Sequence, residues 1–417
     1  MTILNQILIA TGVRKTQTTF LNILFALWLA IPGRINYANL ERFSNLNEKT
    51  FRNWFEKPVE WVHLNANLVR ALQAKTRMGN RLILAVDATS NRKAGKCTPG
   101  LAKFWDSKLG KATQSLELSC CTLIDLEYRQ AIPIHAWQTP AVPPEGESRV
   151  DHYAGHMQDV LGTLHPEVRA QIVCVVGDAY YAKKTFVDGV TGSGKHFVSK
   201  LRSDANLRYL YDGPATGKPG RPQKYAGKVI WSDLSSWTLI SSDEVCSICS
   251  SCAYSPALRR NVLVVCVTWF GLAGKTRREI FFSTDLPMPA LEVIECYRAR
   301  FEMEFSFRDA KRPKPARCCR GVKKQFAGLM DSQSRQAKAL EFHWNASFAV
   351  VSLARVQALL AFDGDVRDFV FSMEDAVRRG YNEFFAARII RLLPLSLSFD
   401  KCVALLEDAL NLGVKAA

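Results

Sequence analysis

The sequence has no apolar run long enough to cross a membrane. Its longest such run spans residues 23–31 and is followed by Pro32, whereas a helix that crosses a bilayer needs about 20 apolar residues. No basic segment followed by an apolar stretch and a small-residue cleavage site opens the chain, so we expect no secretion signal. These absences favour a protein of the cytoplasm without a membrane partner.

Acidic residues are scarce relative to basic ones. The chain has 39 Asp+Glu against 55 Lys+Arg, which gives a formal net charge of +16 at pH 7. Positive charge favours a polyanionic partner, because each neutralised phosphate releases counterions. Acidic substrates and anionic membranes attract cations too, so the charge indicates only the sign of the partner. Without export, the 12 cysteines are expected to be reduced thiols rather than a disulfide framework.

The composition is that of a folded chain of two or three domains. Apolar residues make up 48% of the 417 residues, which excludes a disordered chain. The first 75 residues are predicted to be helical. Residues 35–43 and 49–55 form two short predicted helices around a polar turn, which is typical of a helix-turn-helix. Plain core packing explains the same pattern equally well, and both interpretations stay open. Four basic side chains here could contact phosphates: Arg42, Lys49, Arg52 and Lys57.

From residue 81 the pattern changes to alternating strands and helices. The continuous apolar runs 82–86 and 172–176 predict strands that are buried on both faces. Residues 115–124 and 130–137 alternate around a polar turn and predict a hairpin. Residues 204–284 predict a mostly β insertion, and a long helix is expected from Pro289 to about Lys311.

Both buried strands are predicted to end at an aspartate, Asp87 and Asp178. Functional groups gather where the strands of an α/β sheet end. A carboxylate there is costly unless a cation or hydrogen bonds compensate it, so the pair suggests a shared metal site. A turn or a helix cap explains either aspartate taken alone.

The long predicted helix carries four side chains of different chemistry on one face. At about 100° per residue they fall within a sector of roughly 60°. They are Tyr297, Arg300, Glu304 and Lys311. A core helix would place apolar side chains there instead. A solvated face is the alternative, although phenylalanines flank the stripe.

The spacing Tyr-x2-Arg-x3-Glu-x6-Lys of this stripe resembles the YREK signature of the DDE transposases of bacterial insertion sequences. Residues 86–89, 177–181, 201–204 and 282–286 also resemble segments of this family, and the likeness covers about residues 80 to 350. The resemblance implies an α/β fold: an RNase H-like catalytic core with a mostly β insertion, flanked by N-terminal and C-terminal helical regions.

The resemblance also implies domain boundaries. A helical DNA-binding region would span residues 1–78 and a C-terminal helical region residues 351–417. The catalytic core would comprise residues 79–204 and 286–350, with the β-rich insertion at 205–285 between its two parts.

By the same resemblance, Asp87, Asp178 and Glu304 are the catalytic, metal-binding triad. Two Mg²⁺ ions about 3.5–4 Å apart, with Mn²⁺ able to substitute, would activate the nucleophile and stabilise the leaving oxygen at a phosphodiester. Oxygen ligands suit Mg²⁺.

The other signature residues would bind the DNA phosphates next to the scissile bond. Tyr297, Arg300 and Lys311 have this implied role. An extra basic segment at residues 312–324 departs from the family pattern, so Lys323 and Lys324 are rivals for the role of the signature lysine.

Three weaker signals lie in the insertion. Lys218 and Arg221 belong to a Gly-Arg-Pro segment that could enter an A·T minor groove, with a flexible basic linker as the alternative. Trp237, or Trp231, could stack on a flipped base, although burial in a small core fits better. The C-x2-C-x2-C run at residues 246–252 resembles iron–sulfur ligation, but it has no fourth cysteine at the right spacing, which favours a strand or turn with small thiols.

The resemblance implies a transposase that cuts the ends of its element and joins the 3′-hydroxyls to target DNA, with a cut-and-paste reaction favoured. Double-stranded DNA is then the partner, with a homodimer in the synaptic complex and a location at the bacterial nucleoid when bound to DNA. An RNase H-like nuclease or resolvase without strand transfer is one alternative. A non-catalytic DNA-binding protein derived from an element is another.

Overall fold

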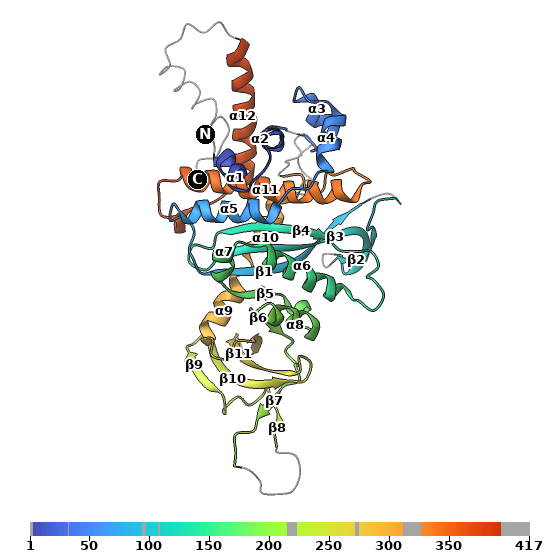
Figure 1. Ribbon diagram of the computed structural model, residues 1–417. Coiled ribbons are helices and arrows are strands. Elements are labelled where there is room, and N and C mark those ends of the chain that lie inside the picture. Colours follow the sequence, from blue (N-terminus) through green and yellow to red (C-terminus); the bar gives the residue numbers. More distant parts are fainter. Residues whose placement is uncertain are drawn as a thin grey trace.

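One mixed β-sheet runs through the molecule: helices gather at one end, and the later strands of the sheet form the other, β-rich end (Figure 1). The computed structural model describes residues 3–31, 33–93, 97–106, 109–214, 223–271, 275–311 and 327–392, with no account of the side chains of residues 389–392.

The central strands come from the middle of the chain. They are β1 (Leu82–Arg92), β2 (Ala102–Asp106), β3 (Lys111–Asp125), β4 (Ala131–Gln138), β5 (Ile172–Gly177) and β6 (His196–Leu201). β1 pairs with β5, and β5 with β6, in parallel, whereas β3 runs antiparallel to both β1 and β4. The resulting order β4-β3-β1-β5-β6, with only β3 reversed, is the RNase H-like arrangement. The fold is therefore α/β with an RNase H-like core, as expected, and the predicted hairpin is confirmed as β3 and β4.

The later strands continue the same sheet. They are β7 (Arg208–Leu210), β8 (Tyr225–Lys228), β9 (Thr238–Ser242), β10 (Cys246–Ser255), β11 (Arg260–Phe270) and β12 (Thr276–Ser283). β12 pairs with β6 in antiparallel register, and β11 and β10 follow in order. These strands form the end of the molecule that lies away from the N-terminal helices (Figure 1).

The remaining elements of the chain are helices. The N-terminal ones are α1 (Ile3–Ala10), α2 (Lys15–Ala30), α3 (Tyr37–Arg42), α4 (Glu48–Phe55) and α5 (Trp61–Gln73). The middle ones are α6 (Arg149–Thr163), α7 (Pro166–Ala170), the 3₁₀ helix η1 (Ala179–Tyr181), α8 (Lys184–Gly192), α9 (Ala290–Ala299) and α10 (Glu302–Ala310). The last are α11 (Ala337–Ala361), the 3₁₀ helix η3 (Val366–Asp368) and α12 (Met373–Leu392).

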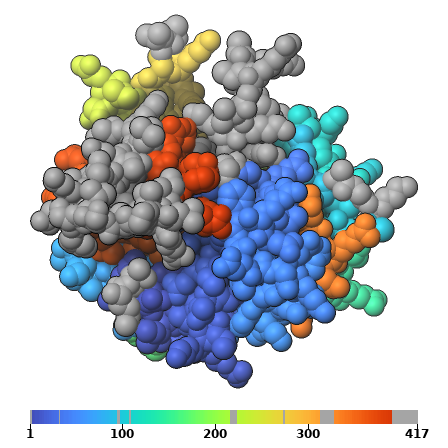
Figure 2. Space-filling model, turned by 90° about the horizontal axis from the view of Figure 1, so that it is seen from above, coloured from blue at the N-terminus to red at the C-terminus, as the bar shows by residue number. Residues whose placement is uncertain are grey.

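The N-terminal helices and α12 share one end of the molecule, where α12 contacts α2 and the N-terminal helices form a broad continuous surface (blue in Figure 2). Helix α11 is long and apolar enough to cross a membrane, but 78% of its most apolar stretch is buried inside the fold. It packs against α5 and β4. Burial on this scale is typical of the core helix of a folded domain.

Side chains from α5 and α11 close the edge of the sheet at β4. Asn345 pairs with both backbone groups of Ala136, donating to the carbonyl oxygen and accepting from the amide at 2.9 Å each. Asn65 donates to the carbonyl oxygen of Ile134 at 2.9 Å. Strand edges with unpaired backbone groups favour association with other chains, and these asparagines satisfy them within the chain.

Two sequence predictions need correction. The first apolar strand does not end at Asp87: β1 continues to Arg92, because its alternating second half pairs with β3 over its whole length. The helix expected from Pro289 to Lys311 is two helices, α9 and α10. In the first turn of α10 the amides of Met303 and Glu304 donate to the carbonyl oxygens of the residues between the helices, three residues earlier, at 3.0 Å each. Such a turn is tighter than an α-helix and changes the direction of the side chains that follow.

Candidate active site

Two aspartates lie side by side in the central sheet. The parallel register pairs Val86 of β1 with Gly177 of β5, so the next residues, Asp87 and Asp178, are neighbours. The strand β5 ends at this point, because Tyr181 folds back over Gly177. A Cβ on Gly177 would lie 3.0 Å from the Cβ of Tyr181, so any larger residue here would require Tyr181 to shift by a few tenths of an ångström.

Local backbone groups orient both carboxylates. Asp87 Oδ1 accepts a hydrogen bond from the Ala88 amide at 2.8 Å. Asp178 Oδ1 accepts one from the Tyr180 amide at 2.9 Å and caps η1. The carbonyl oxygen of Asp178 also accepts from Ser199 Oγ at 2.8 Å, which ties this corner to β6. Each aspartate is therefore held by the strand end or turn that carries it.

The guanidinium of Arg300 joins the first aspartate to the glutamate of the predicted triad. Its Nη1 lies 3.2 Å from Asp87 Oδ2, and its Nη2 lies 3.5 Å from Glu304 Oε1. The Arg300 side chain is 12% exposed, that of Asp87 23% and that of Glu304 44%. Residues from β1, from the turn between α9 and α10, and from α10 therefore meet at one place.

The charges of Asp178 and Glu304 affect the pKa of Asp87. Burial raises the pKa of Asp87 to about 6; Arg300 opposes this rise, whereas Asp178 and Glu304 add to it. Burial also raises the pKa of Tyr297, again against the effect of Arg300 and with the help of Asp178. The Arg300 guanidinium lies 5.6 Å from the centre of the Tyr297 ring. Tyr297 thus lies at the edge of the same cluster.

The signature lysine lies close by, beyond the end of α10. Lys311 has an extended backbone and follows the last helical residue. Its charge lowers the pKa of the Cys120 thiol, which burial raises and Asp87 raises further. Cys120 is the residue of β3 that pairs with Asp87. The rival lysines, Lys323 and Lys324, lie outside the described residues.

The chemistry of the acids suits a divalent cation, and in this arrangement an arginine lies between two of them. Carboxylate oxygens are the ligands that Mg²⁺ and Mn²⁺ prefer. In the part of the chain that the structure describes, no three His, Cys, Asp or Glu side chains lie close enough together for a metal ion. The Arg300 guanidinium instead provides the positive charge between Asp87 and Glu304.

A buried ion pair anchors α10, and the sequence analysis did not single it out. Arg355 of α11 is 7% exposed and Asp309 of α10 is 3% exposed, with 3.5 Å between Nη2 and Oδ2. The Arg355 guanidinium also lies 4.8 Å from the ring centre of Phe371. Arg308 donates to the other Asp309 oxygen at 3.2 Å from the surface side. An arginine inside the apolar run of α11 was the available signal.

Of the residues that the sequence predicted as DNA contacts in the insertion, the structure describes the tryptophans but not the basic residues. Trp237 is 5% exposed, its indole N–H points to the Tyr209 hydroxyl at 3.3 Å, and its ring packs 5.8 Å from Trp231. It belongs to a small core, so the alternative of burial is observed and base stacking is not carried forward. Lys218 and Arg221 lie outside the described residues. Among the described residues of the insertion, β7 and β8 line an open hollow of about 470 Å³.

The three cysteines at 246, 249 and 252 lie along β10 and are free thiols. Successive side chains of a strand point to opposite faces, so Cys249 faces away from Cys246 and Cys252. This placement bears out the interpretation as a strand with small thiols.

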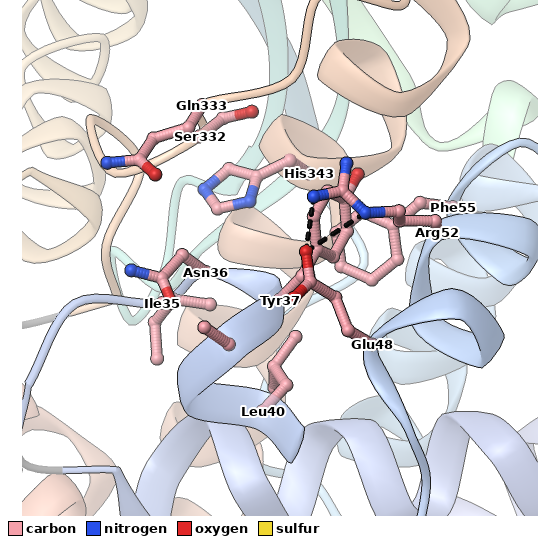
Figure 3. Close-up of a pocket in the computed structure, with 11 residues that line it drawn as sticks. Ile35, Asn36, Tyr37, Leu40, Glu48, Arg52, Phe55, Ser332, Gln333 and His343 are labelled. Carbon is pink, nitrogen blue, oxygen red and sulfur yellow. Dashed lines mark hydrogen bonds and ion pairs between the residues drawn. The ribbon is translucent and has the colours of Figure 1, made fainter. Parts of the chain in front are cut away.

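A cavity of about 200 Å³ lies behind the predicted helix-turn-helix (Figure 3). Arg52 of α4 points into it, pairs with Glu48, and lies 4.6 Å from the centre of the Tyr37 ring. His343 of α11 lines the cavity from the other side. Arg52 pairs within its own chain, but its side chain is 56% exposed, so its predicted phosphate contact stays a prediction. Lys49 and Lys57 are exposed.

The fold and the site first define a class: an α/β protein whose RNase H-like sheet places two aspartates side by side, next to a helix that carries a glutamate. A family model described as a DDE superfamily endonuclease matches residues 5–244, more than half of the chain. The chain therefore belongs to the DDE superfamily of endonucleases. Asp87 and Asp178 lie within the match, and Arg300 and Glu304 lie beyond it.

Two further comparisons were made. No curated protein matches the sequence. Among solved structures, the cryo-EM structure of the piggyBac transposase synaptic complex with hairpin DNA is similar with a TM-score of 0.40 and 10% identity, covering 94% of this chain and 75% of that chain. A likeness this distant carries nothing about function.

Proposed function

We propose that this endonuclease is a DNA transposase of the YREK subgroup of bacterial insertion sequences. It would cut the ends of its element and join the 3′-hydroxyls to target DNA, in a cut-and-paste reaction. The observation that supports this best is the contact of one guanidinium, Arg300, with both Asp87 and Glu304, beside Asp178. Residues far apart in the sequence thus converge as a catalytic constellation requires.

Each residue of the site would have a separate role in the reaction. Asp87, Asp178 and Glu304 would hold divalent cations, Mg²⁺ or Mn²⁺, which supply Lewis-acid activation of the nucleophile and of the leaving oxygen when bound. Arg300 can grip a phosphate with two parallel hydrogen bonds, and Lys311 can act on it as a point charge. Tyr297 sits between Arg300 and Phe281 (5.0 Å between ring centres), so its hydroxyl is held beside the guanidinium.

We extend the proposal to the assembly and the chain organisation. A homodimer would hold two element ends in the synaptic complex, in the cytoplasm and on the nucleoid. Residues 1–78 would bind DNA, 79–204 and 286–350 would form the catalytic core, 205–285 the insertion, and 351–417 the C-terminal helical region.

The test is cleavage and joining of a duplex that carries the ends of the encoding element, with Mg²⁺. Wild-type protein should give cut ends and joined products, and Asp178→Asn and Glu304→Gln should give neither. Glu295→Gln on α9 is the matched control, because Glu295 pairs with Arg129 on the surface. Full cutting by Glu304→Gln would reject the assignment.

The same assay separates the alternatives. A nuclease or resolvase would cut without joined products. A non-catalytic DNA-binding protein would bind the duplex with a steep salt dependence and show no cutting.

A further inference from the structure

Arg300 lies where the acids of the site would need a divalent cation. Its two terminal nitrogens contact Asp87 and Glu304, and the side chain is 12% exposed. The described acids do not form a metal site in this arrangement. A guanidinium and a divalent cation cannot both interact with the same carboxylates at full strength.

We propose that Arg300 is an internal counter-cation that a DNA phosphate withdraws from Asp87 and Glu304, so that DNA binding and divalent-cation binding strengthen each other. This inference rests on the proposed function and adds to it the order of events at the site. Without DNA, the guanidinium neutralises the acids. With DNA, it binds phosphate and leaves the carboxylates to the cation.

The hydrogen bonding of Arg300 supports such an exchange. Its Nε is buried and has no hydrogen-bond partner among the described residues. A buried donor without a partner costs free energy. A phosphate presents several acceptor oxygens and matches the guanidinium fork at least as well as two carboxylates from different elements. The present contacts therefore satisfy Arg300 only in part.

The backbone provides a place for the movement. Arg300 follows the last residue of α9, and the next helical residue of α10 is Glu302. The tight turn between the two helices lets Arg300 reorient without unwinding either one. Glu304 is the most exposed of the three acids whose contacts are described here, at 44%. It can turn toward the aspartates once the guanidinium has left.

Charge sets the direction of the coupling. Removing the positive charge of Arg300 from beside the carboxylates should raise their affinity for a cation. By linkage, the cation must raise the DNA affinity by the same factor by which DNA raises the cation affinity. The proposal therefore makes one claim that two independent binding measurements can check.

The experiment measures Mn²⁺ binding to the full chain by the loss of the free-ion paramagnetic resonance signal, with and without a saturating mixed-sequence duplex. Without DNA, Arg300→Gln should bind Mn²⁺ about tenfold more tightly than wild type. The fold-change in Mn²⁺ affinity that DNA causes should be at least about ten times larger for wild type than for the variant. Fluorescence anisotropy of the duplex measures the DNA affinity with and without Mn²⁺. In each protein Mn²⁺ should tighten DNA binding by the same factor by which DNA tightens Mn²⁺ binding.

Arg298→Gln is the matched control. Arg298 carries the same charge on α9 but lies 6.0 Å from the Trp269 ring, on another side of the helix. Its Mn²⁺ affinity and its coupling should equal those of wild type. Arg300→Lys keeps the charge without the fork and should fall between wild type and Arg300→Gln, which covers the case in which the glutamine variant does not fold.

The outcomes separate this inference from the proposed function. Equal or weaker Mn²⁺ binding by Arg300→Gln without DNA, or an equal effect of DNA on both proteins, overturns the counter-cation role and leaves the acids as cation ligands. If wild type binds no Mn²⁺ even with DNA, the proposed function itself fails, and the counter-cation role fails with it.

Discussion

The guanidinium of Arg300 lies 3.2 Å from the carboxylate of Asp87, although the two residues are far apart in the sequence. This contact links the central strand of an RNase H-like sheet to the helix that carries Glu304. It gives the four-residue signature a physical meaning, because the arginine and the glutamate act on the same aspartate.

The first consequence is a pH dependence of stability that comes from Asp87. Burial raises its pKa to about 6 from 3.8, so the folded protein holds a proton that the unfolded chain releases. Without divalent cations, the unfolding free energy of wild type relative to Asp87→Asn should therefore fall as the pH rises from about 4 to about 6, and then level off.

Urea unfolding in a chelating buffer at several pH values measures this difference. Asparagine cannot titrate, so the difference isolates Asp87. A difference that stays flat, or that grows in favour of wild type across this range, would show that burial does not raise the pKa of Asp87 in the folded protein.

The second consequence concerns the buried pair of Asp309 and Arg355. Arg355→Met alone should lower the unfolding free energy by about 3 kcal/mol, because it removes the buried partner of Asp309 and leaves only the exposed Arg308 bonded to it. The double variant Asp309→Leu/Arg355→Met should recover most of this loss, since apolar pairs can replace buried ion pairs.

If the pair positions Glu304, the double variant should still cut DNA at least about tenfold more slowly, with DNA affinity unchanged. Chemical denaturation and single-turnover cleavage check the two effects separately. Arg308→Gln is the control, because Arg308 bonds the same carboxylate from a 59% exposed position and should change little. Wild-type cleavage by the double variant would limit the pair to stability.

The third consequence concerns the predicted helix-turn-helix. Lys49 is exposed on α4 and has no acidic partner among the described residues, whereas the exposed Arg52 is paired with Glu48 and lies beside Tyr37. If α4 contacts DNA phosphates, Lys49→Ala should weaken duplex binding and lower the slope of log affinity against log salt by about 1.

Anisotropy titrations over a series of salt concentrations measure that slope. Lys75→Ala is the matched control, because Lys75 is exposed beyond the far end of α5. An unchanged slope for Lys49→Ala would favour plain core packing of α3 and α4, the alternative that the sequence left open.

Local patterns made much of this structure predictable. The apolar runs at 82–86 and 172–176 form β1 and β5, and the alternating segments form the β3–β4 hairpin. In each case neighbouring residues carry enough apolar surface to determine the local structure. The spacing of Tyr297, Arg300 and Glu304 predicted the residues that meet, because they lie within little more than two helical turns.

Long-range features could not be predicted in the same way. The continuation of β1 past Asp87 depends on its pairing with β3, and the joining of the insertion to the core depends on the pairing of β12 with β6. The contact of Arg300 with Asp87 and the burial of Arg355 depend on how α10 and α11 dock. Tertiary contacts decide such features, and sequence periodicity does not record them.

The most direct test of the central claim is to locate the cation site on the chain itself. Fe²⁺ that replaces Mg²⁺ in the DNA-bound protein reduces added hydrogen peroxide to hydroxide and a hydroxyl radical, and ascorbate returns the resulting Fe³⁺ to Fe²⁺. The radicals cut the polypeptide beside the bound ion, and mass spectrometry identifies the new ends. We expect cuts near Asp87, Asp178 and Glu304 together, all of them lost in Asp178→Asn. Cuts at only one of these places, or elsewhere in the chain, would contradict a shared cation site.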